Sequence, residues 1–355
     1  MKILVLCLPG IGDSLMATPM IKALRKKFPK ATIDVLCMFR SVEYVLKNNP
    51  NIDNVFFVPI FTDSRPAAIY HLLPYRKKRY DVSVLAFPSF RKEYHVVQWI
   101  INAKKRFAHR FKKGYFTEFT FLNTELISVD ENVHNVINNM NLLNLFGFDW
   151  QKQFKDNSFT YDLSLDPKDK EYGNLYIDKL NWKKDKVVGL HPGSIDSPAG
   201  LLKRWPIERY ISLANKLIEG GYKILVFCGP HEEFLGERIM QGILKKKDAR
   251  LVEGIRFGES LGILSNVAIF ISNDNGFAHL ANALKIKSIV LFGPTNPLWC
   301  APYNKKYSTI IRRAEFDPWF RNDMKVTSPP KKAQGGMDQI GVKNVLEIFK
   351  NEIHR

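Results

Sequence analysis

The sequence predicts an α/β protein made of two successive doubly wound domains with a cleft between them. At 355 residues the chain is longer than a single domain usually grows. Short apolar runs alternate with segments of helical periodicity, which is typical of parallel α/β units. This alternation weakens once, around residues 161–167, and then resumes. We therefore expect a first domain at residues 1–165 and a second at 166–339.

The first half contains four apolar runs that read as strands, each short and bounded by turn residues. We expect these strands at residues 3–8, 32–38, 54–58 and 81–87. Helical periodicity predicts helices near residues 14–28, 42–47, 94–102 and 131–146. Pro19 lies inside the first of these helices and is expected to kink or delay it.

The second half repeats the pattern after a charged segment in which Asp166-Pro167 leads into a helix. We expect strands at residues 186–190, 223–227, 250–252, 267–272 and 288–292. Helices are expected near residues 207–219, 232–246, 259–265 and 277–284. An irregular segment at 317–336 precedes a last amphipathic helix at 342–349.

The charge of the chain is strongly basic and unevenly distributed. The net charge is +18, and residues 65–113 contain 13 Lys/Arg against 2 Asp/Glu, a balance of +11. A solvated surface, an anionic lipid surface, an acidic acceptor or nucleic acid would each explain this excess. No RRM, KH, zinc-finger or helix-turn-helix signature accompanies the charge, so nucleic acid is not expected as a partner.

Other global features exclude several classes of protein. No apolar run approaches the roughly 20 residues that a membrane-spanning helix requires. The apolar start of the chain is too short for an export signal, which predicts a cytoplasmic protein. Cys7, Cys37, Cys228 and Cys300 form no C-x-x-C pair, so we expect free thiols. The absence of Asp-x-Asp, H-E-x-x-H and Cys/His clusters predicts no metal ion, and no cofactor is expected.

The first candidate motif, Gly10-Ile11-Gly12-Asp13, follows the first predicted strand. Glycines at a strand end let a ligand approach the backbone, and the following helix N-terminus favours anions. Leu15 replaces the third glycine of a dinucleotide site, and the Lys of a P-loop is absent. From these residues alone, Asp13 is either a helix N-cap or a functional carboxylate.

A second motif, His191-Pro192-Gly193-Ser194, ends the first strand of the second domain, and Lys203-Arg204-Trp205-Pro206 follows it. Small residues at a strand end, with basic residues on the loop to the next helix, suit a phosphate group. Lys203 read alone is equally a surface charge.

The third motif runs from Ser272 to Ala281 and places Asp274, Asn275 and Gly276 between a strand and a helix. Open α/β sheets bind ligands at this edge, where Asp274 would hold sugar hydroxyls and the helix N-terminus would face a diphosphate. The alternative is a turn followed by a helix cap. We expect His279 to have a packing role. Glu232 or Glu233, after Gly229-Pro230, would accept hydrogen bonds from a ribose or occupy the first turn of a helix.

Taken in order, these motifs resemble glycosyltransferase family 9, the heptosyltransferases of lipopolysaccharide core assembly. The matching residues are listed here in chain order: Gly10-Ile11-Gly12-Asp13, Thr18-Pro19, His191-Pro192-Gly193-Ser194, Lys203-Arg204-Trp205-Pro206, Gly229-Pro230-His231-Glu232, Asp274-Asn275-Gly276-Phe277-Ala278-His279, Phe292-Gly293-Pro294-Thr295 and Gly336-Met337-Asp338-Gln339-Ile340. The resemblance covers nearly the whole chain.

The resemblance implies a GT-B fold, with an acceptor-side first domain, a donor-side second domain and a last helix, 340–355, that packs back on the first. It implies an inverting, metal-independent transfer of a sugar, usually heptose from ADP-heptose, to an anionic glycolipid such as the lipopolysaccharide core. By this resemblance Asp13 is the general base, Ser194 and Lys203 bind the diphosphate, Glu232 binds the ribose, and Asp274 with Asn275 and Gly276 completes the donor site.

On the acceptor side we expect Gly10, Gly12, Arg65, Arg76 and Lys77, with Asp13 on one wall of the cleft and Lys203 and Asp274 on the other. The basic segment at 65–113 would face the lipid acceptor, which predicts peripheral contact with the inner face of the cytoplasmic membrane.

Three departures from the family pattern affect these expectations: a long loop at 195–202 before Lys203, Asn275 where the family has Thr or Ser, and no Cys at 317–336. Because Asn275 removes a hydroxyl from the donor site, a donor sugar other than heptose stays open as an alternative. The alternatives to a transferase are a nucleotide-sugar epimerase or hydrolase on the same scaffold, and a non-catalytic binder of anionic glycan or lipid.

Overall fold

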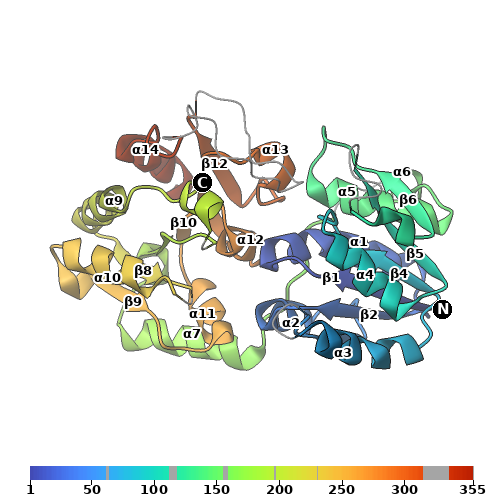
Figure 1. Ribbon diagram of the computed structural model, residues 1–355. Coiled ribbons are helices and arrows are strands. Elements are labelled where there is room, and N and C mark those ends of the chain that lie inside the picture. The colour runs from blue at the N-terminus through green and yellow to red at the C-terminus, as the bar shows by residue number, and fades with distance from the viewer. Residues whose placement is uncertain are drawn as a thin grey trace. The chain divides into compact units, whose positions relative to one another are not determined.

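The computed structural model divides the chain into two compact units, residues 1–164 and 165–355, which are described separately (Figure 1). It describes residues 1–60, 64–111, 118–154, 159–195, 197–229, 231–314 and 336–354. The boundary between Ser164 and Leu165 lies one residue from the expected one. No helix in these ranges is long and apolar enough to cross a bilayer.

The first unit is a parallel six-stranded sheet in the order β3-β2-β1-β4-β5-β6. Its strands are β1 (Lys2–Cys7), β2 (Thr32–Cys37), β3 (Asn54–Phe57), β4 (Val82–Leu85), β5 (Lys105–Arg110) and β6 (Glu125–Ser128). Its helices are α1 (Ile11–Lys27), α2 (Arg40–Leu46), α3 (Arg65–Lys77), α4 (Lys92–Ile101), α5 (Asn135–Asn141) and α6 (Trp150–Gln153). Short 3-10 turns at Thr120–Leu122 and Leu142–Phe146 complete it.

Alternate residues of β1 face opposite sides of this sheet, as expected for a strand buried on both faces. Leu4 and Leu6 join a core with Ala68 and Leu72 of α3 and Val97 of α4. On the other side α1 packs on β1 and contacts α2 and α5. Helices α3 and α4 therefore share one face of the sheet.

The second unit has the same topology, with the parallel order β12-β11-β10-β7-β8-β9. Its strands are β7 (Val187–His191), β8 (Lys223–Phe227), β9 (Ala249–Val252), β10 (Ile269–Asn273), β11 (Lys287–Phe292) and β12 (Ser308–Arg312). Its helices are α7 (Pro167–Lys179), α8 (Pro198–Leu201), α9 (Ile207–Glu219), α10 (Glu233–Gly242), α11 (Phe257–Leu264), α12 (Gly276–Ala283), α13 (Pro297–Cys300) and α14 (Val342–Ile353). It also contains 3-10 turns at Lys184–Lys186 and Lys246–Asp248.

The predicted GT-B class, two Rossmann-like doubly wound domains, agrees with these two sheets. The predictions omitted the helices α3, α6, α8 and α13 and the strands β5, β6 and β12. Strand β5 was overlooked because its sequence is dominated by Lys105, Arg106 and Arg110. Only its middle residues are buried, Phe107, Ala108 and His109, so the strand carries no long apolar run.

Helix α1 begins at Ile11, so Pro19 does not delay it, and the helix continues through Pro19 to Lys27. Pro19 has no N–H to donate to the Leu15 carbonyl four residues earlier. The hydroxyl of Thr18 donates to that carbonyl oxygen at 2.7 Å and accepts from the backbone N–H of Asp162 at 3.0 Å. A side-chain hydrogen bond thus replaces the missing backbone bond.

Helix α14 differs from the expectation that the last helix packs back on the first domain. Val345 and Phe349 are buried in the core of the second unit, and α14 packs against α9 and β11 (Figure 1). Thr309 and Lys287 donate hydrogen bonds to Glu352 near the end of the helix. The apolar face of α14 therefore packs on the second unit.

Candidate functional site

The candidate donor site lies where the strand order of the second sheet reverses, between β7 and β10. Ligands of open α/β sheets bind at this point, beyond the carboxyl ends of the strands. The loop after β7 contains Gly193 and Ser194, and the loop after β10 contains Asp274 and Asn275. Because β7 and β10 pair directly, two motifs about eighty residues apart in sequence meet here.

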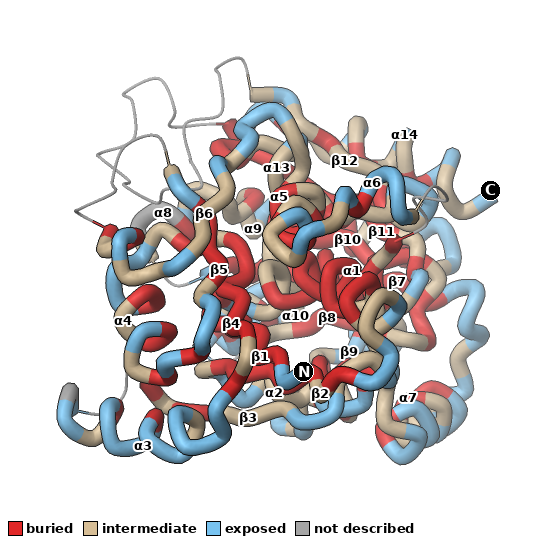
Figure 2. Tube along the Cα trace, turned by 90° about the vertical axis from the view of Figure 1, so that its right-hand side faces the viewer, coloured by how far each residue is buried: buried red, intermediate tan, exposed pale blue. Residues whose placement is uncertain are grey.

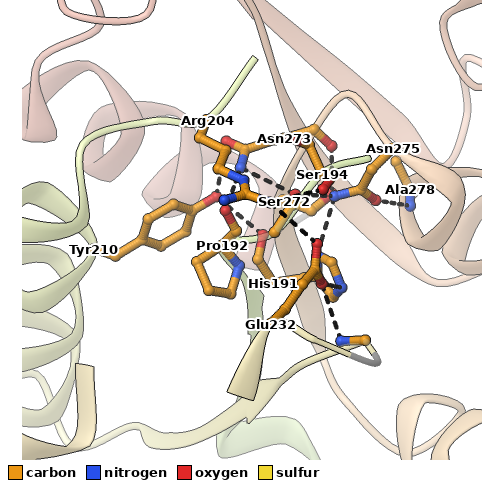
Figure 3. Close-up of polar contacts among 12 residues, drawn as sticks. His191, Pro192, Ser194, Arg204, Tyr210, Glu232, Ser272, Asn273, Asn275 and Ala278 are labelled. Atoms are coloured by element: carbon orange, nitrogen blue, oxygen red, sulfur yellow. Dashed lines mark hydrogen bonds and ion pairs between the residues drawn. The ribbon is translucent and has the colours of Figure 1, made fainter. Parts of the chain in front are cut away.

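Asn273, the last residue of β10, holds the loops of this site together and is fully buried (Figure 3). Its Oδ1 accepts from the backbone N–H of Trp205 and from the hydroxyl of Tyr210, both at 3.1 Å. Its Nδ2 donates to the carbonyls of Pro192 at 2.7 Å and Gly193 at 3.3 Å. Both ends of the amide are used, so the loop bearing Lys203 and the loop after β7 are attached to one strand end.

Lys203 lies inside this site. Its Nζ is 2.8 Å from Asp274 Oδ2, and the two side chains are only 14% and 7% exposed. The hydroxyl of Thr295, after β11, donates to the same carboxylate oxygen at 2.7 Å. The long loop before Lys203 contains the short helix α8. Despite the length of this loop, Lys203 contacts Asp274.

Glu232 is buried beside the loop after β7. Its Oε2 accepts from the backbone N–H of Gly229 at 3.0 Å, and Arg204 lies 3.9 Å from its Oε1 (Figure 3). Burial raises the pKa of Glu232, while the N–H of Gly229 and the charge of Arg204 lower it. A Cβ on Gly193 would lie 2.1 Å from Glu232 Oε2, so only glycine fits there with this carboxylate in place.

Arg204 and His191 complete the surroundings of Glu232. The guanidinium of Arg204 donates to the carbonyl of Ser194 at 3.0 Å. His191 Nε2 is 3.5 Å from Glu232 Oε2, and its ring stacks on Phe277 with centroids 4.5 Å apart. Burial lowers the pKa of His191 to about 4, so the ring is neutral at physiological pH.

Asn275 caps α12, because its Oδ1 accepts from the backbone N–H of Ala278 at 3.2 Å. Its Nδ2 donates to the Gly193 carbonyl at 2.9 Å and lies 3.0 Å from His191 Nδ1. Gly276 begins the helix, and His279 is buried, as its expected packing role requires. Asn275 therefore supplies the cap that a Thr or Ser would supply, and it also links the two loops.

Ser194 is buried, and its hydroxyl donates to the carbonyl of Gly200 at 2.7 Å. This bond closes the loop that leads to Lys203. Pro230, within the motif before Glu232, lies outside the described residues.

In the first unit, Gly10, Gly12 and Asp13 lie at the carboxyl edge of the sheet, where α1 begins. The N-cap of α1 is Gly10, so the alternative of Asp13 as the N-cap is wrong. Asp13 lies in the first turn, where the helix dipole favours a carboxylate. Burial raises the pKa of Tyr94 on α4 to about 12, Arg91 lowers it, and the negative charge of Asp13 raises it further.

Arg76 and Lys77 do not lie with these residues. They end α3, which runs antiparallel to the strands, and Lys2 at the start of β1 contacts the carbonyl of Lys78. They are therefore at the amino edge of the sheet, opposite Asp13. Arg76 donates to the carbonyl of Ile100 at 3.1 Å. The side chain of Arg65 lies outside the described part of the chain.

Several of the basic residues in the 65–113 segment have partners within the first unit. Lys104 pairs with Asp81 at 2.8 Å and Lys105 with Glu125 at 3.0 Å. Arg106 donates to the carbonyls of Leu122 and Ala103. Lys112 and Lys113 lie outside the described residues. Part of the positive charge of this segment is therefore matched by carboxylates and backbone carbonyls of the first unit itself.

Two successive doubly wound parallel sheets are the architecture of the GT-B fold class, and the second sheet has a buried lysine–carboxylate pair at its switch point. Residues 94–326 match Glycosyltransferase family 9 (heptosyltransferase). The chain belongs to this family and is a transferase.

Individual relatives agree with this assignment. The chain is 25% identical over 321 residues to lipooligosaccharide heptosyltransferase 2 of Haemophilus ducreyi, with 88% of each chain covered. It is 34% identical over 132 residues to lipooligosaccharide heptosyltransferase 2 of Haemophilus influenzae, covering 36% of this chain and 37% of that relative.

Solved structures show the same fold. The E. coli ADP-heptose lps heptosyltransferase II aligns with a TM-score of 0.77 and 20% identity, over 100% of this chain and 99% of that one. A glycosyl transferase family 9 protein of Veillonella parvula aligns with a TM-score of 0.80 and 20% identity, covering 99% and 97%.

Asn273, Tyr210 and Thr295 were not among the predicted site residues. Asn273 resembles an ordinary turn residue in sequence, and Tyr210 lies on the apolar face of α9. Thr295 could have been predicted from the sequence, because it follows a strand and a Gly-Pro pair. The other site residues also come directly after strands. No cluster of three or more His, Cys, Asp or Glu side chains suited to a metal occurs in the described ranges.

Proposed function

We propose that this protein transfers a sugar, heptose from ADP-heptose, to an anionic glycolipid of the lipopolysaccharide core, with inversion and without a metal ion. The observation that carries the proposal is the buried pair of Lys203 and Asp274 at the N-terminal end of α12. The family and the relatives named above support the choice of heptose and of a lipopolysaccharide acceptor.

In the proposed reaction an acceptor hydroxyl loses its proton to Asp13 as its oxygen bonds to the anomeric carbon. The bond from that carbon to the diphosphate oxygen breaks, and its electron pair leaves with ADP. The negative charge that develops on the diphosphate is stabilised by the ammonium of Lys203 and by the N-terminus of α12. Asp13 and the donor site thus act on the two substrates of one reaction.

The donor-site residues have distinct tasks in this proposal. Lys203 turns from Asp274 toward the diphosphate, and Asp274, still bonded to Thr295, accepts from the sugar hydroxyls. Glu232 accepts from the ribose through Oε1, because its Oε2 is already bonded to the N–H of Gly229. Ser194 can donate to a phosphate oxygen only after its hydroxyl leaves Gly200. Gly10 and Gly12 let the acceptor approach the backbone beside Asp13.

The decisive experiment measures ADP release from ADP-heptose in the presence of acceptor. Asp13→Asn should lower turnover by about 10²–10⁴ while leaving ADP affinity nearly unchanged. Lys203→Met should weaken ADP binding by about tenfold or more, since charge-assisted bonds to phosphate contribute about 1.5–3 kcal/mol. Glu171→Gln, which changes an exposed carboxylate on α7, is the matched control. Normal turnover by Asp13→Asn would remove this residue from the mechanism.

Three further outcomes would change the proposal. Sugar release or isomerisation from the donor alone would indicate a hydrolase or an epimerase. Tight glycolipid binding with no turnover of any donor would indicate a binding protein. Loss of turnover in EDTA that is restored by a divalent cation would contradict metal independence. A thermal-shift screen of ADP-, UDP- and GDP-sugars tests the donor, because a bound ligand raises stability by mass action.

We also place the enzyme in the cytoplasm, in peripheral contact with the membrane that holds its acceptor. The basic excess of the first unit supports this location, because anionic lipids attract clustered Lys and Arg. Sedimentation of the full chain with anionic vesicles, but not with neutral ones, is the expected result.

A further inference from the structure

Helix α3 has apolar side chains on its solvent side as well as on the side that packs on the sheet. Ala68 and Leu72 are buried in the core of the first unit. On the outer side, Ile69, Tyr70 and Leu73 are 46%, 72% and 40% exposed. Their spacing places them on one face of the helix. These three exposed side chains are not part of the core, and a cluster of exposed apolar residues commonly marks a binding surface.

Trp99 on α4 extends the stripe. Its side chain is 51% exposed, and α4 packs beside α3 (Figure 2). Arg76 at the end of α3 donates to the carbonyl of Ile100, which brings the end of α3 next to Trp99. The described part of the first unit has seven large exposed apolar residues, and four of them lie on these two helices. The clustering distinguishes this surface from isolated exposed side chains.

Basic residues border the apolar stripe. Arg76 and Lys77 are exposed at its end on α3, and Lys92 lies seven residues before Trp99 on the same face of α4. Glu93 is the single acidic residue in the two helices. Exposed aromatic and aliphatic side chains flanked by Lys and Arg are typical of surfaces that lie in the interface of an anionic bilayer.

We propose that the outer surface of α3 and α4 docks on an anionic lipid bilayer. The docking surface consists of Ile69, Tyr70, Leu73, Arg76, Lys77, Lys92 and Trp99. The inference deepens the proposed function, on which it rests, by assigning the membrane contact to particular residues. In this proposal Arg76 and Lys77 bind lipid headgroups. They do not bind the acceptor beside Asp13, as the sequence had suggested.

This placement is compatible with access to a glycolipid. Helix α3 covers one face of the sheet and runs along the strands, so a bilayer beneath it lies parallel to the sheet. Asp13 lies at the carboxyl edge of the sheet, in the first turn of α1, which packs on the opposite face. It would then be roughly two helix diameters, about 20–24 Å, farther from the lipid than α3. The sugar chain of a glycolipid can extend around the edge of the sheet over such a distance, whereas docking through the amino edge would point Asp13 away from the lipid.

The first test is sedimentation of the full chain with vesicles of phosphatidylcholine and phosphatidylglycerol in equal parts. The double variant Tyr70→Ser/Trp99→Ser should bind about tenfold more weakly, because both side chains are lost from the bilayer interface. Lys92→Glu should weaken binding by at least about fivefold and reduce its dependence on salt. Leu175→Ser, which removes a 61% exposed side chain from α7, is the matched control and should bind normally.

A second measurement separates this proposal from the proposed function. Tyr70→Ser/Trp99→Ser should transfer sugar normally to a deacylated, soluble acceptor and lose transfer to the same acceptor embedded in vesicles. Unchanged vesicle binding by this variant would overturn the docking surface, whatever the activity on soluble acceptor. Absence of transfer to either acceptor by the unaltered protein would instead contradict the proposed function.

Sedimentation velocity tests a rival occupant of the surface. A dimer of the unaltered protein that dissociates in Tyr70→Ser/Trp99→Ser, without vesicle binding by either, would identify an interface between two copies and overturn the proposal. A monomer that binds vesicles supports it.

Discussion

The ammonium of Lys203 lies 2.8 Å from Asp274 Oδ2, although 71 residues separate the two in sequence. Both side chains are largely buried, and removal of one partner from such a pair leaves a poorly solvated charge. The pair therefore contributes to stability as well as to the proposed chemistry.

We expect Lys203→Met and Asp274→Asn each to lower the free energy of unfolding, Lys203→Met by about 3–5 kcal/mol because Asp274 stays buried and charged. The double variant should cost less than the sum, with a coupling energy of about 1–3 kcal/mol. Denaturant unfolding of the four proteins measures the cycle. Strictly additive effects would show that the two side chains do not interact in solution.

Asn273 should be the least replaceable residue of the donor site. Asn273→Ala leaves the N–H of Trp205 and the carbonyl of Pro192 without their partner, so we expect a loss of about 2 kcal/mol or more in the free energy of unfolding. The hydroxyl of Tyr210 keeps the carbonyl of His191, and the carbonyl of Gly193 keeps Asn275.

Asn273→Asp keeps the acceptor for Trp205 and Tyr210 but cannot donate to Pro192 and Gly193. It should also weaken ADP binding, because the loop after β7 is released. Thermal unfolding and ADP titration test both variants, and Asn266→Ala, which changes a buried amide outside the site, is the control. Equal losses of ADP affinity in Asn273 and Asn266 variants would contradict a specific positioning role.

His109 should make the stability of the protein depend on pH. Burial lowers its pKa to about 4, its Nε2 lies 2.9 Å from the Asn138 carbonyl oxygen, and its buried Nδ1 has no partner in the described structure. Between pH 4 and the ordinary pKa of about 6.5 the unfolded chain binds the extra proton. This contribution to stability is complete above pH 6.5, declines as the pH falls toward 4 and amounts to about 3 kcal/mol.

The matched variant is His109→Gln, which keeps a side-chain donor for the Asn138 carbonyl but does not titrate. Unfolding in guanidinium between pH 4 and 7 should show a shallower pH dependence for this variant, by up to about 1.4 kcal/mol per pH unit. Parallel curves for the two proteins would show that His109 is not buried as a neutral ring.

Thr18 and Pro19 should be energetically coupled. Thr18→Val removes the hydroxyl that serves the Leu15 carbonyl and the Asp162 N–H, at an expected cost of about 1–3 kcal/mol. In a Pro19→Ala background residue 19 has its own N–H for the Leu15 carbonyl, so the same substitution should cost less. Thr18→Ser retains the hydroxyl and is the control. Denaturant unfolding measures the cost in each background. An equal cost in both would show that the Thr18 hydroxyl does not replace the backbone hydrogen bond that Pro19 cannot make.

Much of the fold was predictable because buried parallel strands have a strong local signal. The strand at 223–227 and the helix at 207–219 occur at the expected residues. Strands β5, β6 and β12 were not predicted, because their residues are partly exposed or charged and little distinguishes them from loops. Helix α3 was missed since Pro66 and Pro74 interrupt its periodicity.

The sequence by itself determined the repeated βα order and the loops that end in Gly, Ser, Asp and Asn, because these depend on local propensity and spacing. Only the tertiary structure decided that Lys203 meets Asp274, that Asn273 joins two loops, and that Arg76 lies at the edge of the sheet opposite Asp13. These relationships depend on the order in which strands pair and on the direction of each crossover helix. Strand order is set by packing between distant segments, which no local pattern records.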